Sequence, residues 1–381
     1  MIYLDNAATS WPKPPEVLDA VTHFLQENGA NPGRSGHRRS VEASRIVYAA
    51  REALCQLVNG PDPLRVVFGH NITDALNLAL FGLLRSGDHV VTSSMEHNSV
   101  MRPLSILKLR GLEVSVVKCS SEGYLNPYEV EAAIRPDTRL LVINHGSNVT
   151  GTVQPLKEIG SISRKHNTLL LVDCAQTAGA FPIDMKDDAI DLLAFTGHKA
   201  LLGLTGTGGL IIGERVDVDQ LIPLKFGGTG SHSESELQPS FLPDKYESGT
   251  INAVGLAGLN AGVRWLLDCG LASVRAHEKE LIDLLLDGLS SIPAITVYGG
   301  HATDNHVATV GFNVAGLQPS DVALQLDDNF EIMCRSGLHC APAAHRTIGT
   351  FPIGCVRFSL GMFTSKTEID AVLSAVNELR L

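Results

Sequence analysis

The chain has 381 residues, 44% of them hydrophobic, and carries 30 basic against 41 acidic side chains, a net charge of −11. This acidic balance, without a run of Lys or Arg, argues against nucleic acid as a partner. No apolar run reaches the ~20 residues of a membrane-spanning helix, and the first ten residues do not resemble a secretory signal, so we expect a cytoplasmic protein. Seven scattered cysteines without a CxxC pair indicate neither a disulfide framework nor a metal site.

Short runs rich in Val, Ile and Leu alternate with helical stretches through the first two-thirds of the chain. Strands that are covered on both faces are apolar throughout. The alternation therefore predicts an α/β fold, with a mostly parallel seven-stranded sheet between helices. The expected strands are 65–69, 89–93, 112–117, 139–145, 168–173, 191–196 and 208–213, and the helices between them are 73–84, 98–110, 126–134 and 156–166.

The pattern changes after about residue 258 and predicts a smaller α+β domain. Its expected elements are a helical stretch over 258–290, strands at 295–299, 307–314, 330–335 and 355–361, and helices from 319 and over 366–379. We expect the extended first residues to join it. The predicted division is a large domain of residues 16–257 and a small domain of residues 1–15 and 258–381. The Gly- and Ser-rich segment 225–250 is a loop long enough to be functional or mobile.

Polar side chains follow several predicted strands at their carboxyl ends, where ligands collect in open α/β sheets. Lys199 lies just beyond one apolar strand, and Asp173 ends another. Desolvation lowers the pKa of such an amine and makes it nucleophilic, while a buried carboxylate needs a positively charged partner. Together they predict a site for pyridoxal phosphate (PLP), with Lys199 forming a Schiff base and Asp173 facing the ring nitrogen. For Lys199 alone, a lysine pointing into water is the alternative.

Further residues near the strand ends suit a phosphorylated aromatic ligand. The start of a helix favours an anion through its free N–H groups, an imidazole can stack on a ring, and an amide can donate to a phenolic oxygen. The candidates are Ile72, Thr73, Thr196 and His198 for the phosphate, His97 for the ring face, and Asn148 or Gln176 for the phenolic oxygen. Each also has a structural interpretation as a helix cap, a loop histidine or a turn residue.

The segment RSGLHCAPAAH, residues 335–345, places Cys340 near a guanidinium, Arg335, and an imidazole, His339. A structural thiol usually has apolar neighbours, so this setting favours a reactive cysteine in a loop. An unassisted thiol has a pKa of ~8.5, and Arg335 or His339 would raise its thiolate fraction. We expect packed, unreactive thiols at the cysteines in or next to predicted strands, Cys174, Cys334 and Cys355.

Taken together, the chain resembles the class V aminotransferases of PLP fold type I, and within them the cysteine desulfurases. The resemblance runs over nearly the whole chain, from YLDNAATS near the start to VRFSLGMFTSKTEID near the end. Ten ordered segments carry it: 3–10, 31–40, 72–79, 95–100, 145–155, 172–180, 196–203, 247–255, 335–341 and 356–370.

The resemblance implies a role for each residue at a motif position. Lys199, Cys340 and His97 would be catalytic, and Thr250 would reach the phosphate bound by a neighbouring subunit, which implies a homodimer. Arg357 would grip the substrate carboxylate through two hydrogen bonds, a task suited to Arg. The other implied positions are Lys199, Asp173, Gln176, His97, Ile72, Thr73, Thr196, His198 and Asn148 for the cofactor, and Asn148, Arg335, Asn6 and Ala7 for the substrate.

The implied activity is that of a PLP-dependent cysteine desulfurase, which converts L-cysteine to L-alanine and leaves sulfur as a persulfide on Cys340. The segment RSGLHCA resembles the second desulfurase group, whose motif has a further histidine where this chain has Leu338. In that group an accessory protein often accepts the sulfur. The resemblance also implies a place in sulfur mobilisation, including iron–sulfur cluster assembly.

Other functions remain open. An aminotransferase for a small amino acid would use the same cofactor without Cys340, and a selenocysteine lyase would use the same residues on a different substrate. A binding protein that does no chemistry would not need Lys199, Asp173 and Arg357. A nicotinamide-dependent dehydrogenase would need GxGxxG directly after the first strand, and that pattern does not occur there.

Overall fold

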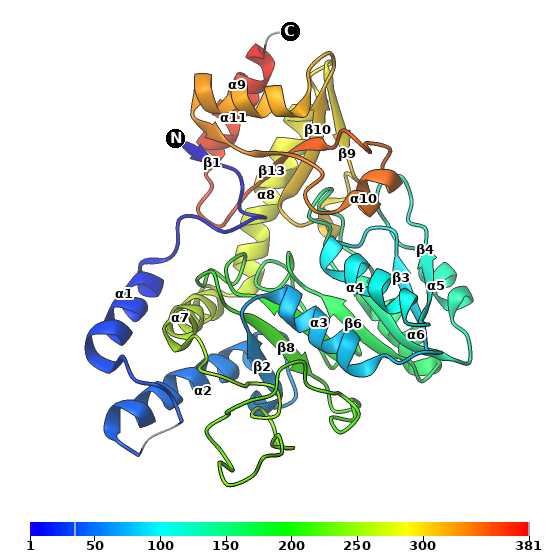
Figure 1. Ribbon diagram of the computed structural model, residues 1–381. Helices are drawn as coiled ribbons and strands as arrows, with labels where there is room; N and C mark the ends of the chain where they lie inside the picture. The colour runs from blue at the N-terminus through cyan, green and yellow to red at the C-terminus, as the bar shows by residue number, and fades with distance from the viewer. Residues whose placement is uncertain (34–35, 380–381) are drawn as a thin grey trace.

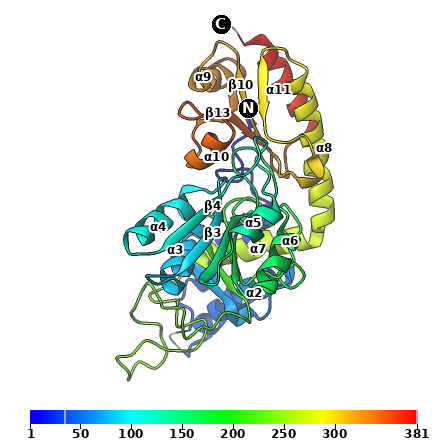
Figure 2. The same ribbon diagram turned by 90° about the vertical axis from the view of Figure 1, so that its right-hand side faces the viewer.

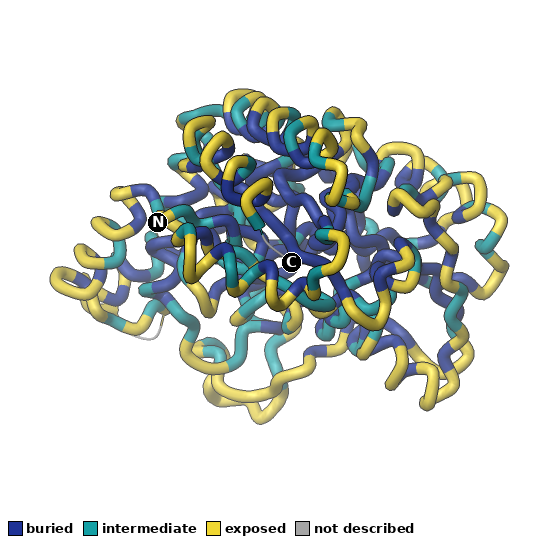
Figure 3. The backbone as a smooth tube through the Cα atoms, turned by 90° about the horizontal axis from the view of Figure 1, so that it is seen from above, coloured by how far each residue is buried: buried dark blue, intermediate teal, exposed yellow. Residues whose placement is uncertain are grey.

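The structure is a computed structural model that describes residues 1–33 and 36–379. Two residues of the expected motif 31–40, Arg34 and Ser35, lie outside the described part of the chain. Figure 1 shows a large sheet with its helices in the lower half and a smaller group of strands and helices above it. Buried backbone fills the interior, and exposed turns surround it (Figure 3). No helix in the described ranges is both long enough and apolar enough to span a bilayer.

The large sheet has seven strands in the order β2-β8-β7-β6-β5-β3-β4. Their bounds are β2 (Val66–Gly69), β3 (His89–Ser93), β4 (Glu113–Val117), β5 (Thr138–Asn144), β6 (Leu169–Asp173), β7 (Leu192–Thr196) and β8 (Gly208–Ile212). All neighbours are parallel except β8, which runs antiparallel to β2 and β7. The predicted mostly parallel, seven-stranded sheet is confirmed, and each predicted strand overlaps an observed one.

Helices cover both faces of this sheet because successive strand residues point to opposite sides. Leu140 and Val142 belong to the core cluster that includes α3 (Ile72–Leu83) and α4 (Asn98–Leu109). Leu141 and Ile143 belong to the opposite cluster, with residues from α2 (Arg38–Val58), α5 (Pro127–Ala133), α6 (Leu156–Lys165) and α7 (Ala253–Cys269). Figure 2 shows α3 and α4 on one side of the strands and α5 and α6 on the other. α1 (Pro15–His23) packs against α7.

The small domain is built on a four-stranded antiparallel sheet, in the order β12-β13-β10-β9. Its strands are β9 (Ile295–Tyr298), β10 (Thr309–Val314), β12 (Arg335–Gly337) and β13 (Cys355–Ser359); its helices are α8 (Leu271–Ser290), α9 (Pro319–Phe330), α10 (Pro342–Thr347) and α11 (Lys366–Glu378). The first strand of the chain, β1 (Ile2–Tyr3), pairs in parallel with β11 (Ile332–Met333). Short helical turns occupy Phe24–Asn28, Pro63–Arg65 and Thr303–Asn305.

Two predicted elements differ from the structure. The helical stretch expected over 258–290 is two helices, α7 and α8, separated by Gly270 at φ 76°. A helix commonly ends at a residue in this left-handed region, which glycine adopts without a Cβ penalty. The single strand expected over 330–335 is two short strands in the structure, β11 and β12. The proposed domain boundary at residues 257 and 258 falls inside α7.

The segment 225–250, all of which the structure describes, contains no helix or strand. Near its end, Glu247 forms a two-pronged ion pair with Arg51 of α2, with oxygen–nitrogen distances of 2.6 and 2.8 Å. Both side chains are buried. This pair attaches the end of the long loop to the large domain.

Candidate active site

One cavity of about 390 Å³ lies where the carboxyl ends of β5, β6 and β7 meet the small domain. Because parallel strands end at the same edge of a sheet, residues far apart in sequence meet there. The predicted site residues that line this cavity are Ala7, Ile72, Thr73, His97, Asn148, Asp173, Gln176, Thr196, His198, Lys199, Arg335, Cys340 and Arg357.

Two predicted site residues lie elsewhere. Asn6 borders a smaller cavity beside Lys199; its amide donates to the Ser359 carbonyl and its oxygen accepts from the Trp11 N–H, both at 3.1 Å. Asn6 therefore fastens the N-terminal segment. Thr250 is exposed and lines a separate pocket with His70 and Ser248. Within one chain, Thr250 is thus not part of the main cavity.

The cavity also includes polar residues to which the sequence analysis gave no site role. They are Thr9, Asn71, Ser99, Asn144 and Thr205. The sequence contains features that could have indicated two of these residues, Ser99 and Thr205. Ser99 follows His97 at a helix start, and Thr205 lies in the glycine-rich segment GLTGTGG, a weak phosphate-loop signal because its spacing matches no standard motif.

Lys199 and Asp173 face this cavity from the ends of adjacent strands. Burial lowers the pKa of the Lys199 amine to about 8, and the Asp173 charge acts in the opposite direction. Burial also raises the pKa of Asp173, whose Oδ1 accepts a hydrogen bond of 2.9 Å from the Ala175 N–H. A desolvated amine with a nearby carboxylate is suited to attack a carbonyl carbon.

His97 forms the start of α4 as well as part of the cavity wall. Its Nδ1 accepts a 3.1 Å hydrogen bond from the Ser99 N–H, so its side chain is the N-cap of the helix. Burial, assisted by the positive charge of Lys199, lowers the pKa of His97 to about 4. The ring is therefore neutral at pH 7 and carries its proton on Nε2.

The start of α3 provides a site for an anion. Asn71 caps this helix by accepting from the Asp74 N–H at 3.0 Å, and the helix dipole favours negative charge at this end. The Thr73 hydroxyl lies 2.8 Å from the Ser99 hydroxyl. Burial lowers the pKa of His198 to about 4, and its Nδ1 has no hydrogen-bond partner among the residues described.

Arg357 is buried at the centre of β13 and shares a carboxylate with Arg335 of the paired strand. One oxygen of Asp5 lies 2.7 Å from Arg357, and the other lies 2.9 Å from Arg335. Arg357 also donates to the Asn148 carbonyl at 3.1 Å. In the part of the chain that the structure covers, the Arg357 Nε and the Asn148 Oδ1 have no partner. The Arg357 Nε–H can donate to a ligand carboxylate, whereas the Asn148 Oδ1 is an acceptor and suits a hydroxyl or amino group of a ligand.

The Cys340 loop is a strained turn held from two sides. His339 and Cys340 have φ values of 50° and 55°, a region that residues other than glycine seldom adopt. The Asn98 N–H donates to the Cys340 carbonyl and the Asn148 amide donates to the His339 carbonyl, both at 2.8 Å.

The thiol of Cys340 is exposed, in contrast to the buried thiols of Cys174 and Cys355. Burial and the charge of Arg357 lower the pKa of His339 to about 2. His339 is therefore neutral. Of the two neighbours expected to favour a thiolate, only Arg335 carries positive charge.

The cavity fits PLP in three respects. It has a desolvated lysine; for a phosphate, a helix start and a lining histidine, His198, whose Nδ1 has no partner among the described residues; and a neutral ring at its wall. The fold and this cavity define an α/β protein of PLP fold type I. The sequence model described as Aminotransferase class-V matches residues 2–372. The chain belongs to the class V aminotransferase family, in the branch of the cysteine desulfurases, as the resemblance predicted.

The relatives match over almost their full length. The chain is 35% identical to a probable cysteine desulfurase from Methanothermobacter thermautotrophicus, over 99% of this chain and 94% of that protein. It is 31% identical to a cysteine desulfurase from Escherichia coli, over 100% and 93%. The apo structure of a cysteine desulfurase from Thermococcus onnurineus NA1 matches with a TM-score of 0.93 at 32% identity, over 99% and 94%. The desulfurase CsdA from Escherichia coli matches with a TM-score of 0.88 at 29% identity, over 98% and 93%.

Proposed function

We propose that the chain is a PLP-dependent cysteine desulfurase, which converts L-cysteine to L-alanine and receives the sulfur on Cys340. One observation carries this proposal: Lys199 and Asp173 from the large sheet share a cavity with the exposed Cys340 and with Arg357 from the small domain. The relatives that bear the name cysteine desulfurase support it.

Lys199 would hold PLP covalently, and Asp173 would pair with its ring nitrogen. His97 would lie against the ring, and the start of α3 would hold the phosphate. The remaining cofactor contacts in this proposal are Ile72, Thr73, Thr196, His198, Gln176 and Asn148. When bound, PLP withdraws electrons from the substrate Cα and so weakens the bond between Cβ and sulfur.

The chain's own groups then have separate tasks. Arg357 holds the substrate carboxylate, with Arg335 and Asn148 beside it. The Lys199 amine, with a pKa of about 8, carries the proton to and from the substrate Cα. The Cys340 thiolate attacks the substrate sulfur; the new S–S bond forms as the C–S bond breaks, and the electron pair stays with Cβ, which takes up a proton to become the methyl group of alanine.

We further propose a cytoplasmic homodimer that passes its persulfide sulfur to an acceptor protein, including one that serves iron–sulfur cluster assembly. The exposure of Cys340 supports transfer to a second protein. The exposed position of Thr250 outside its own chain's cavity supports a contact with a neighbouring subunit. The division into residues 16–257 and residues 1–15 with 258–381 remains part of this proposal.

The test is product analysis on the PLP-loaded protein with L-cysteine and L-selenocysteine side by side. With excess dithiothreitol, which reduces the Cys340 persulfide back to the thiol and releases its outer sulfur as sulfide, we expect alanine and sulfide from L-cysteine in equal amounts, with a fall of at least about 100-fold in Cys340→Ser, which loses the nucleophile. Lys199→Ala should lose the absorbance of the bound cofactor, and Cys269→Ser, at a thiol remote from the cavity, should behave as the unmodified chain.

The outcomes separate the alternatives. Alanine formation that persists in Cys340→Ser contradicts the proposal, and amino transfer to a keto acid by the same variant points to an aminotransferase. Turnover of L-selenocysteine alone points to a selenocysteine lyase.

A further inference from the structure

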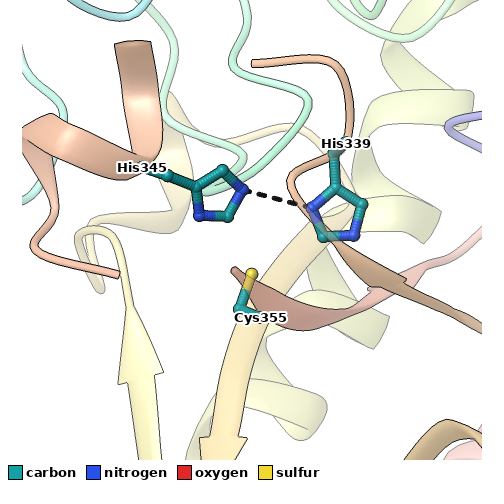
Figure 4. Close-up of side chains that lie close together, drawn as sticks. All are labelled: His339, His345 and Cys355. Carbon is teal, nitrogen blue, oxygen red and sulfur yellow. Dashed lines mark hydrogen bonds between the residues drawn. The ribbon is translucent and has the colours of Figure 1, made fainter. Parts of the chain in front are cut away.

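A group of side chains that could bind a metal ion lies next to Cys340, outside the residues that line the main cavity apart from His339. His339 directly precedes Cys340, His345 lies in α10, and Cys355 begins β13. All three side chains are buried, with 8%, 0% and 0% of their surface exposed. One nitrogen or sulfur from each lies within 4.8 Å of the others. Figure 4 shows the Cys355 sulfur pointing toward the two imidazole rings.

The spacing of the two rings fits a shared metal ion. Nδ1 of His339 and Nε2 of His345 are 3.4 Å apart, which is long for a hydrogen bond between nitrogens. Two nitrogens bound to one tetrahedral zinc ion, each at about 2.0–2.1 Å from it, lie roughly 3.3–3.4 Å apart. The observed separation of the two nitrogens matches this spacing, and the Cys355 sulfur lies within 4.8 Å of both.

A second contact orients His345 for binding. Its Nδ1 lies 2.6 Å from the hydroxyl of Thr350, which is itself buried. Metal-binding histidines usually engage their other ring nitrogen in such a hydrogen bond, which fixes the direction of the ring. The contact leaves Nε2, the nitrogen that faces His339, free to bind.

We propose that His339, His345 and Cys355 bind a zinc ion. Two imidazole nitrogens and a thiolate are a donor set that zinc prefers, and a fourth position remains for water or another donor. On binding, the Cys355 thiol gives its proton to solvent, the thiolate becomes the ligand, and no electron is transferred. The ligands come from three elements with spacings of 6 and 10 residues along the chain, so no CxxC-type motif marks them.

This site goes beyond the proposed desulfurase activity, because no step of the sulfur transfer uses these three side chains. The ion would join the loop of Cys340, helix α10 and strand β13 at one point. Because its ligand His339 directly precedes Cys340, the bound ion would stabilise the strained turn that presents the thiol.

The experiment measures zinc on the PLP-loaded protein after removal of metal with a chelator and readdition of zinc chloride. We expect about one zinc per chain, and with Co²⁺ in its place the d–d absorption of a thiolate-bound tetrahedral ion. His345→Gln and Cys355→Ala should each bind zinc at least about 100-fold more weakly, and Thr350→Val about 10- to 100-fold more weakly. Cys119→Ser changes another buried thiol and should keep the zinc, as should Cys340→Ser.

Three results would overturn the site: less than one-tenth of a zinc per chain in the unmodified protein, undiminished binding in His345→Gln, or loss of zinc in Cys340→Ser, which would place the ion on the exposed thiol. Cofactor absorbance and circular dichroism identify any variant that fails to fold. If Cys355→Ala is such a variant, His345→Gln decides. Absence of desulfurase activity in a chain that binds one zinc would contradict the proposed function and leave the zinc site standing.

Discussion

At the scale of single residues, the carboxylate of Asp5 contacts both arginines that the proposed function assigns to the substrate. One carboxylate oxygen of Asp5 contacts a terminal nitrogen of Arg357, and the other contacts a terminal nitrogen of Arg335. Asp5 therefore holds both guanidinium groups in place at the cavity. The Arg357 Nε has no partner among the described residues, and a substrate carboxylate would supply one. If Arg357 binds the substrate carboxylate as proposed, its guanidinium is already in position, which would lower the cost of binding.

We predict that Arg357→Lys raises the KM for L-cysteine by about 10- to 100-fold and changes kcat less. A charged hydrogen bond contributes about 1.5–3 kcal/mol, and an ammonium group cannot reproduce the geometry of a guanidinium. Steady-state sulfide release measures both constants. Arg45→Lys, at an exposed arginine paired with Glu42, is the control and should leave them unchanged. An unaltered KM in Arg357→Lys would assign the substrate carboxylate to another residue.

The lowered pKa of Lys199 predicts a pH dependence for cofactor capture. At pH 8 about half of the Lys199 amines are unprotonated, against about 0.3% for a lysine with the ordinary pKa. Only the unprotonated amine attacks an aldehyde, so the rate at which the cofactor-free protein binds PLP should rise about tenfold per pH unit below about pH 8 and level off above it.

Stopped-flow absorbance across this pH range measures the capture rate. Because the Asp173 charge acts to raise the pKa of the amine, Asp173→Asn should move the break to lower pH. A rate that continues to rise through pH 10 would mean that the amine is not desolvated.

At the scale of elements, helix α4 and the cavity share His97. The side chain caps the helix through Nδ1 and presents its ring to the cavity. These two tasks can be separated, because asparagine is among the best helix caps but has no aromatic ring.

We predict that His97→Ala lowers the free energy of unfolding of the cofactor-free protein by about 1 kcal/mol, whereas His97→Asn changes it little. Both variants should lose desulfurase activity to a similar degree, since both lack the ring. Urea unfolding and sulfide release measure the two effects. Full activity in His97→Asn would show that capping is the only task of this residue.

The strands were predictable because strands buried on both faces leave unbroken apolar runs in the sequence. The break between α7 and α8 at Gly270 was not predictable from the sequence. The helical pattern continues on both sides of this residue, and a single glycine is compatible with a helix interior. In the cavity, Asp173 and Lys199 were predictable because they lie at or just beyond the ends of apolar strands, and an amine and a carboxylate suit one ligand. The position of Thr205 in the cavity was not predictable, because it depends on the path of a loop. The cluster around His345 combines three elements whose distances only tertiary packing determines.

At the scale of the whole molecule, the proposed homodimer makes each site depend on both chains. Thr250 lies outside its own chain's cavity, so in the dimer it would complete the phosphate site of the partner. A chain with Thr250→Val would then damage its partner's site, and a chain with Lys199→Ala would damage its own.

We predict that an equimolar mixture of Thr250→Val and Lys199→Ala regains activity after subunit exchange. Half of the dimers would be mixed, each with one intact site, so activity should reach about a quarter of that of the unmodified enzyme. The assay needs a PLP concentration at which Thr250→Val alone is mostly unloaded. Light scattering checks the dimer. Activity no greater than the sum of the two separate variants would rule out the shared site.

The pairing of the first strand with β11 has a consequence for how the chain is made. Ile2 pairs with Ile332, and the Ala7 N–H donates to Ser359 at 2.9 Å. This segment is thus synthesised long before the strands with which it pairs. At about 5–20 residues per second, it waits roughly 15 to 65 seconds before residue 332 is synthesised. Until then residues 2 and 3 have no partner strand, and none of the seven strands of the large sheet depends on them for pairing.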